Sequence, residues 1–223
     1  MKNNLGMFCG LLRLGLGATV LVFCAFTPVS RADVIVNNMG DARFSNYDSS
    51  SAEIAQVFTM SGTSGNLSSL TLSLDSTLGG TANVYLFTTS SGAPTGAATI
   101  LGTVTAGTSG NRQSISVSSL NGVTLTAGSS YAIALAQNST VRWDNTLTTG
   151  SGGTGSLGAI YTSGNSGATW AFNSGVVFMQ MNLQITPVPE VPMTGAVMGF
   201  GVLAIAVGGT LRRKLKPAVS SIA

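Results

Sequence analysis

Apolar and polar residues alternate through the middle of this chain, and this pattern limits the possible folds more than any other feature. Successive side chains of a β-strand point to opposite faces, so a two-residue period places the apolar residues on one face. The clearest segments are SLTLSLD (69–75), ANVYLFTT (82–89), QSISVSS (113–119), SYAIALAQ (130–137) and VVFMQMNLQIT (176–186). No helical period interrupts them between residues 60 and 186. We therefore expect β-strands, each with one buried face.

Six shorter segments are also expected to be strands. They are VIVNN (34–38), AQVFTM (55–60), TILGTVTA (99–106), VRWD (141–144), GAIYTS (158–163) and ATWAF (168–172). Segments rich in Gly, Ser and Asn, such as SSGAPTG and TTGSGGTGS, separate the strands as turns. About eleven short strands joined in this way predict an all-β fold, a single antiparallel β-sandwich of the jelly-roll type over residues 33–186.

Hydroxyl groups rather than charges cover the polar faces of these strands. Only 8% of the residues are charged, and in segment 69–75 Thr71, Ser73 and Asp75 alternate with leucines. We expect these three side chains to face solvent. The formal net charge of +3 comes from the two ends, since residues 33–188 contain three arginines and six acids. The basic balance of the whole chain is therefore no indication of nucleic-acid binding.

Residues 1–32 have the composition of a secretory signal peptide. A basic start precedes the apolar segment 14–26, and small residues lead to an expected cleavage site between Ala32 and Asp33. An uncleaved anchor is the alternative, but 13 apolar residues are fewer than the roughly 20 that a spanning helix needs. We expect the mature chain to begin at Asp33 and to be exported.

The amino-acid composition argues against most kinds of catalysis. The chain has no histidine, and its two cysteines, Cys9 and Cys24, lie in the expected signal peptide. The usual catalytic bases and soft metal ligands are then missing, so we expect neither an enzyme nor a cofactor. Binding of a structural Ca²⁺ ion by loop oxygens is an alternative that the sequence leaves open, although no EF-hand loop is present. A glycan hydrolase with two carboxylates also stays open. It is the less favoured alternative, because no second acid flanks Asp144 in the sequence.

Two tryptophans suggest a binding site for sugars. Trp143 and Trp170 each lie on a short expected strand beside a loop. Together with Tyr161 they would form an aromatic platform against which sugar rings stack, and Asp144 would bond the sugar hydroxyls. The alternative is that the tryptophans pack between the two sheets, as is common in β-sandwiches. The sequence leaves both interpretations open.

The C-terminal residues form three consecutive segments. A proline-rich linker (187–192) is followed by an uncharged segment (193–211) and a basic tail (212–223). The 19 uncharged residues would make a helix of about 28 Å, enough to cross a bilayer core. The cations that follow it favour the cytoplasmic side and would stop transfer; they are Arg212, Arg213, Lys214 and Lys216. We expect one transmembrane helix, with the β domain held outside.

This order of segments resembles the PEP-CTERM sorting signal of exosortase substrates. Val188, Pro189 and Glu190 match its Val-Pro-Glu, whereas Val191 stands at the usual second proline and Pro192 follows it. The resemblance implies recognition by an exosortase, a membrane-embedded enzyme similar to a transpeptidase. It implies cleavage near Pro189 and Glu190 and delivery of the body to the cell surface or to extracellular polysaccharide. A permanent single-span anchor is the alternative.

Segment 52–186 resembles a second family. A SLTL strand, a GAPTG turn and an LTAGSSY segment follow one another, an order similar to that of the bacterial surface proteins called choice-of-anchor R domain proteins. This resemblance implies no activity. The chain is thus expected to be an exported surface protein of the envelope or the extracellular polysaccharide matrix, with a structural, adhesive or glycan-associated role. A carbohydrate-binding module presented on the cell surface is the alternative.

Overall fold

The structure is a computed structural model that describes the body of the chain. The described residues are 31–48, 52–76, 78–108, 113–117, 120, 122–136, 140–149, 152–175 and 177–188, with the backbone of the segments 8–11 and 22–25. The chain divides into two compact units, Met1–Val188 and Pro189–Ala223. The second unit, with the expected membrane helix and basic tail, lies outside the described residues. Within the described residues, no helix has the length and apolar character needed to cross a membrane.

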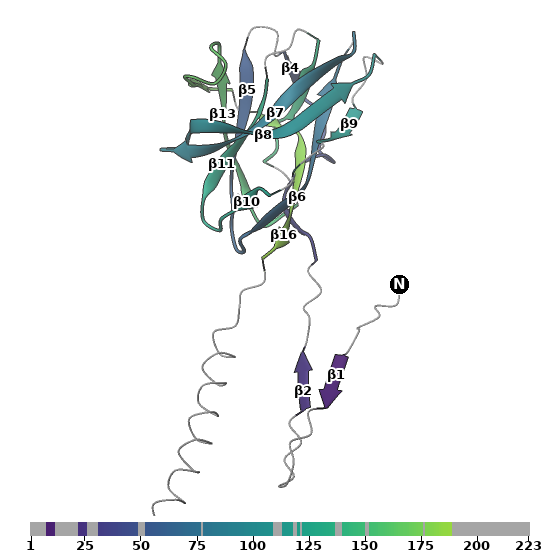
Figure 1. The fold of residues 1–223 in the computed structure, drawn as a ribbon. Coiled ribbons are helices and arrows are strands. Elements are labelled where there is room, and N and C mark those ends of the chain that lie inside the picture. Colours follow the sequence, from purple (N-terminus) through teal and green to yellow (C-terminus); the bar gives the residue numbers. More distant parts are fainter. Residues whose placement is uncertain are drawn as a thin grey trace, which may run out of the picture. The chain divides into compact units, whose positions relative to one another are not determined.

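Every regular element of the described residues is a β-strand, and the strand pairs are antiparallel (Figure 1). One large sheet has eight strands: β3 (Asp33–Asn37), β4 (Ser45–Asp48), β6 (Gly65–Asp75), β9 (Gln113–Ser116), β10 (Thr124–Leu125), β12 (Arg142–Thr146), β15 (Phe178–Met179) and β16 (Met181–Pro187). The other has six: β5 (Glu53–Thr59), β7 (Gly80–Ser90), β8 (Ala93–Ala106), β11 (Ser130–Leu135), β13 (Ser156–Ser163) and β14 (Ala171–Asn173). Within the expected signal peptide, β1 (Phe8–Leu11) pairs with β2 (Val22–Ala25).

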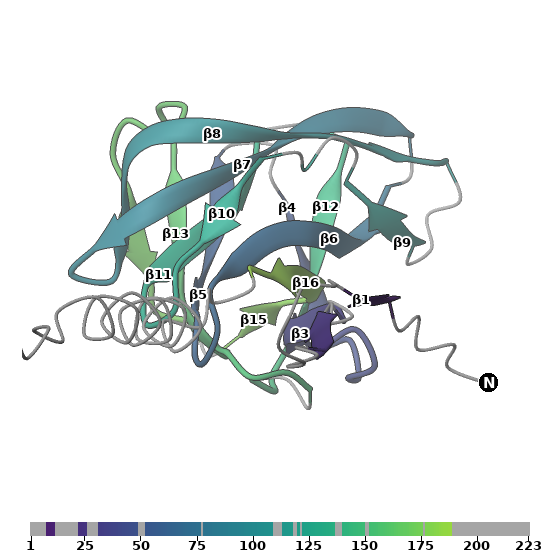
Figure 2. The same ribbon diagram turned by 60° about the horizontal axis from the view of Figure 1, so that its bottom comes forward.

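The two large sheets share one hydrophobic core. Leu70, Leu72 and Leu74 of β6 are fully buried in it, as their alternation predicts, and Phe58 of β5 belongs to the same cluster. In Figure 2, β7 and β8 of the six-stranded sheet lie above β6 and β16 of the eight-stranded sheet. The expected all-β fold of antiparallel sheets is confirmed.

The polar face of β6 differs from the expectation near its C-terminal end. Ser73 and Asp75 are buried rather than exposed, whereas Thr71 is partly exposed. Other segments provide their partners: the Ser73 hydroxyl donates to Asp144 (2.8 Å), and Arg43 lies 2.9 Å from Asp75. Alternation assigns a side chain to one face of a sheet, but it does not show whether another segment covers that face.

The expected single strand 176–186 is interrupted at Gln180, between β15 and β16. The side chain of Asn38, which is buried just after β3, fills the gap. Its amide donates to the backbone oxygen of Met179 (3.0 Å), and its oxygen accepts from the backbone nitrogen of Met181 (2.7 Å). Because these backbone groups bond to a side chain instead of a neighbouring strand, the ladder is broken at this point.

The structure differs from the sequence-based expectation in two further places, at two short strands and at one turn. The sequence does not predict β4 and β10, which are too short to show a two-residue period and which pair with the longer strands β12 and β6. The SSGAPTG segment was expected to be all turn, but only Ser91 and Gly92 form the turn, and β8 begins directly after them. Both residues have positive φ (51° and 84°), as a type I′ hairpin turn requires.

Candidate functional site

The structure separates the residues of the expected aromatic platform. Trp143 and Asp144 of β12 are both 0% exposed. The indole of Trp143 lies in the shared core and donates to the backbone oxygen of Gln180 (3.0 Å). Trp170 and Tyr161 pack instead against a second hydrophobic cluster. The interpretation in which both tryptophans form a sugar-binding platform is therefore wrong, because Trp143 is a core residue.

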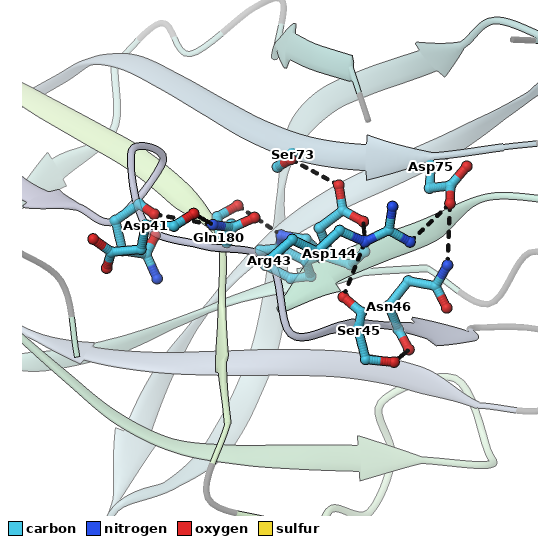
Figure 3. Close-up of polar contacts among 10 residues, drawn as sticks. Asp41, Arg43, Ser45, Asn46, Ser73, Asp75, Asp144 and Gln180 are labelled. Atoms are coloured by element: carbon cyan, nitrogen blue, oxygen red, sulfur yellow. Dashed lines mark hydrogen bonds and ion pairs between the residues drawn. The ribbon is translucent and has the colours of Figure 1, made fainter. Parts of the chain in front are cut away.

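Asp144 is a buried member of a polar cluster around Arg43, whose own side chain is 32% exposed (Figure 3). The guanidinium of Arg43 lies 2.9 Å from an oxygen of Asp144 and 2.9 Å from an oxygen of Asp75. The Ser73 hydroxyl donates to Asp144 (2.8 Å), and the Asn46 amide donates to Asp75 (3.1 Å). These bonds join the segment around β4 to β6 and β12 of the eight-stranded sheet.

This Arg43 cluster brings two carboxylates together, but it does not make them available to a substrate. Glycoside hydrolysis needs both carboxyl groups at the sugar, roughly 5 to 10 Å apart. Here one guanidinium binds both acids, and Asp144 is fully buried. Such an arrangement compensates buried charges and supports the fold. Among the described residues, no three His, Cys, Asp or Glu side chains lie close enough to hold a metal ion.

The six-stranded sheet carries the second hydrophobic cluster, on the face opposite the shared core. Its members alternate along β5, β7 and β11 with core residues, so they point the other way. Two small residues form its centre, because Ala55 of β5 lies opposite Ala134 of β11. Tyr161 of β13 pairs with Ala55, and Tyr85 of β7 pairs with Ala134. Aromatic side chains thus lie on both sides of a flat, alanine-lined centre, and Phe87 is buried beside them.

A pocket of about 450 Å³ lies on this face. The described residues that line it are Glu53, Tyr85, Phe87, Ala98, Ala136 and Ser166. Glu53 is 6% exposed, and its Oε2 atom has no hydrogen-bond partner among the described residues. Burial disfavours the charged form and raises the pKa of the Glu53 carboxyl above its usual value. Glu53 is the one charged group among these lining residues, so its charge dominates the pocket.

The loop between β13 and β14 approaches this pocket closely. The Ser163 hydroxyl accepts a hydrogen bond from the backbone nitrogen of Gly167 (2.9 Å), which holds the loop against β13. Ser166 and Gly167 have φ values of 57° and 78°, as in a type I′ turn. A Cβ atom at Gly167 would lie 3.1 Å from Cζ of Phe87 and 3.2 Å from Oε2 of Glu53. The absence of a side chain at Gly167 therefore allows the loop to pack close to both groups.

Trp170 ends this loop and packs on Phe87, a residue that lines the pocket. Its indole packs edge-to-face on Phe87, with ring centroids 5.2 Å apart. Its Nε1 atom is buried and has no hydrogen-bond partner among the described residues. Tyr161 packs in the same manner on Phe172, with centroids 5.8 Å apart. Trp170 thus positions Phe87, which lines the pocket, while Tyr161 extends the aromatic surface toward β14.

A second pocket, of about 300 Å³, lies beside the Arg43 cluster. Two of its lining residues, Phe44 and Leu147, are 61% and 53% exposed. Its charged group, Arg43, is already paired with Asp75 and Asp144. This pocket therefore offers an apolar surface without an uncompensated polar group.

No family model, curated protein or solved structure matches this chain. The function is therefore inferred from the geometry of the site. The sequence predicts Trp170 and Tyr161 as binding residues, but not Glu53, Tyr85 or Phe87. The signal for these three was present: Tyr85 and Phe87 are two residues apart on one strand, and Glu53 is the single acid of an otherwise uncharged strand.

Proposed function

We propose that this chain is an exported bacterial protein of the cell surface or extracellular polysaccharide matrix that binds glycan without reacting with it. Its sandwich, of the jelly-roll type, would bind the glycan through the pocket beside Glu53. One observation carries the proposal: Tyr85 and Phe87 line a pocket of about 450 Å³ together with a carboxylate that is largely buried. Apolar ring faces and a few polar groups are the features that binding sites for small ligands combine.

Export and sorting are supported by the two ends of the chain. The signal peptide of residues 1–32 would direct export, and the segment 193–211 would hold the chain in the membrane until an exosortase cleaves near Glu190. The sandwich extends almost to this motif, since Pro187 still pairs with β6 and the backbone nitrogen of Val188 donates to Ser64 (3.2 Å). The linker to the membrane is therefore short in this proposal.

A purely structural or adhesive role is the second candidate. It is favoured by the second pocket, where the apolar side chains of Phe44 and Leu147 are exposed. Exposed apolar surface of this kind fits contact with another macromolecule better than contact with a sugar. The two candidates differ in the pocket that they use, so one experiment can separate them.

Binding of the full chain to oligosaccharides tests the proposed function. The chain is kept in a polyoxyethylene detergent, and the probes are oligomers of glucose, N-acetylglucosamine and glucosamine with equal length and linkage. We expect at least one of them to bind, and Tyr85→Ala to weaken that binding at least about tenfold. Phe44→Ala removes an exposed aromatic side chain beside the second pocket and should leave the affinity unchanged. The proposal fails if none of the three probes binds, or if Tyr85→Ala binds them as tightly as the unchanged protein.

A further inference from the structure

Glu53 is the part of the pocket that stacking of a sugar ring does not explain. Glu53 is 6% exposed, and the Oε2 atom of its carboxyl group is buried without a hydrogen-bond partner among the described residues. A carboxylate in such a place loses its hydration without gaining an ion pair, which is unfavourable. The protein compensates a similar burial at Asp144, where Arg43 and Ser73 contact the acid. A ligand that brought a positive charge to Glu53 would offset the unfavourable burial there.

The surroundings of Glu53 also favour a cation. None of the described lining residues is a lysine or arginine, and residues 33–188 contain six acids but only three arginines. Tyr85 and Phe87 line the same pocket, and the faces of aromatic rings attract cations. An ammonium group would therefore meet both a carboxylate acceptor and aromatic rings in one place.

We propose that this pocket selects amino sugars whose nitrogen is not acetylated, with the ammonium group bound to Glu53 and the sugar ring against Tyr85. The inference rests on the proposed glycan-binding function and names its ligand class. A charge-assisted hydrogen bond is roughly twice as strong as a neutral one. A sugar hydroxyl or an N-acetyl group also donates a hydrogen bond, but neither carries a positive charge that could pair with the buried carboxylate. Acetylation of the nitrogen thus removes the decisive interaction.

The same three oligomers test this selectivity, because they differ only in the group at one ring carbon. We expect the glucosamine oligomer to bind at least about tenfold more tightly than the other two. Glu53→Gln keeps the size of the side chain and should reduce the glucosamine affinity to that of the neutral oligomers, whose own binding should stay within about twofold. Asp41→Asn is the charge-matched control. Asp41 accepts a hydrogen bond from Thr148 beside the eight-stranded sheet. Removing the negative charge of Asp41 therefore tests the general attraction between a cationic oligomer and an acidic protein.

Each outcome supports or overturns the inference. Selective binding of glucosamine that depends on Glu53 but not on Asp41 supports it. The inference is overturned if the acetylated or the glucose oligomer binds as tightly as the glucosamine oligomer. It is also overturned if Glu53→Gln and Asp41→Asn lose equal affinity for the glucosamine oligomer. In either case the glycan-binding function stands if Tyr85→Ala still weakens binding. Absence of binding to all three probes overturns both proposals. Equal binding of the three probes by the unchanged protein overturns the inference even if the Glu53→Gln variant does not fold.

Discussion

Two acidic residues of this protein are buried in different ways. Asp144 is fully buried, with Arg43 and the Ser73 hydroxyl bound to it. Glu53 is almost as deeply buried, but its Oε2 atom has no hydrogen-bond partner among the described residues. Removing water from a charge is unfavourable unless a partner replaces it. The first acid therefore supports the fold through its partners, whereas the second reduces stability whenever it is ionised.

Glu53→Gln is expected to stabilise the free protein at neutral pH. Burial raises the pKa of Glu53 in the folded state above its usual value, so the folded chain holds this proton more tightly than the unfolded chain. The stability that the protonated Glu53 carboxyl contributes is fully present below its pKa in the unfolded chain. It is lost as the pH rises through its pKa in the folded chain. Glutamine is neutral at every pH and avoids this loss. We expect a higher Tm by at least about 2 °C at neutral pH.

Thermal unfolding of both proteins between about pH 4 and pH 8 checks this prediction. The difference in Tm should be small at the acidic end and grow with pH. Tyr85, the other titratable side chain among the described lining residues, is present in both proteins and cancels in the comparison. A difference that is independent of pH, or that shrinks as the pH rises, would contradict a raised pKa at Glu53.

At the scale of strands, the two-residue period predicts most of the fold. β6, β7 and β11 lie where it places them, because each has a complete apolar face. The period cannot predict β4 or β10, which form where the longer strands β12 and β6 offer unpaired backbone groups. It also cannot separate Trp143 from Trp170, since burial depends on which face of which sheet each one joins. The sequence therefore predicts Trp170 and Tyr161 at the candidate site. It does not predict Glu53, Tyr85 and Phe87, because the pairing of distant strands brings these residues together.

The break between β15 and β16 leads to a prediction about Asn38. Asn38→Ala should leave the backbone oxygen of Met179 and the backbone nitrogen of Met181 without their buried partner. An unpaired buried polar group costs about 1 to 3 kcal/mol, so the free energy of unfolding should fall by at least about 2 kcal/mol. Denaturant unfolding measures this loss, and amide exchange should show faster exchange at Met181.

Asn173→Ala provides a matched control for that experiment. It makes the same truncation at a partly exposed site, where the Asn173 amide donates to the Tyr47 hydroxyl (2.6 Å). Solvent can replace this bond, so we expect a loss smaller than that of Asn38→Ala. Equal losses in the two variants would mean that Asn38 does not hold the strand break together.

At the scale of the whole molecule, the expected processing sites lie outside the two large sheets. β3 begins at Asp33, directly after the expected signal cleavage site, and β16 ends at Pro187, before the expected sorting cleavage. These two strands pair with each other, Asp33 lying opposite Ile185. Cleavage at both points would therefore leave every strand of the shared core intact, and the processed chain should unfold with the same Tm as the chain that keeps its tail.

The mass of the intact protein recovered from cells that contain an exosortase tests the processing itself. We expect a chain that starts at Asp33 and ends near Glu190, with any attached glycan as added mass. Glu190→Ala should increase the share of protein that retains its tail, because the acid is central to the Val-Pro-Glu match. Val191→Pro restores the usual Pro-Glu-Pro order and should decrease that share. A tail retained to Ala223 in all three proteins would contradict sorting and favour a permanent anchor. A response to Glu190→Ala but not to Val191→Pro would show that the processing enzyme accepts valine at this position.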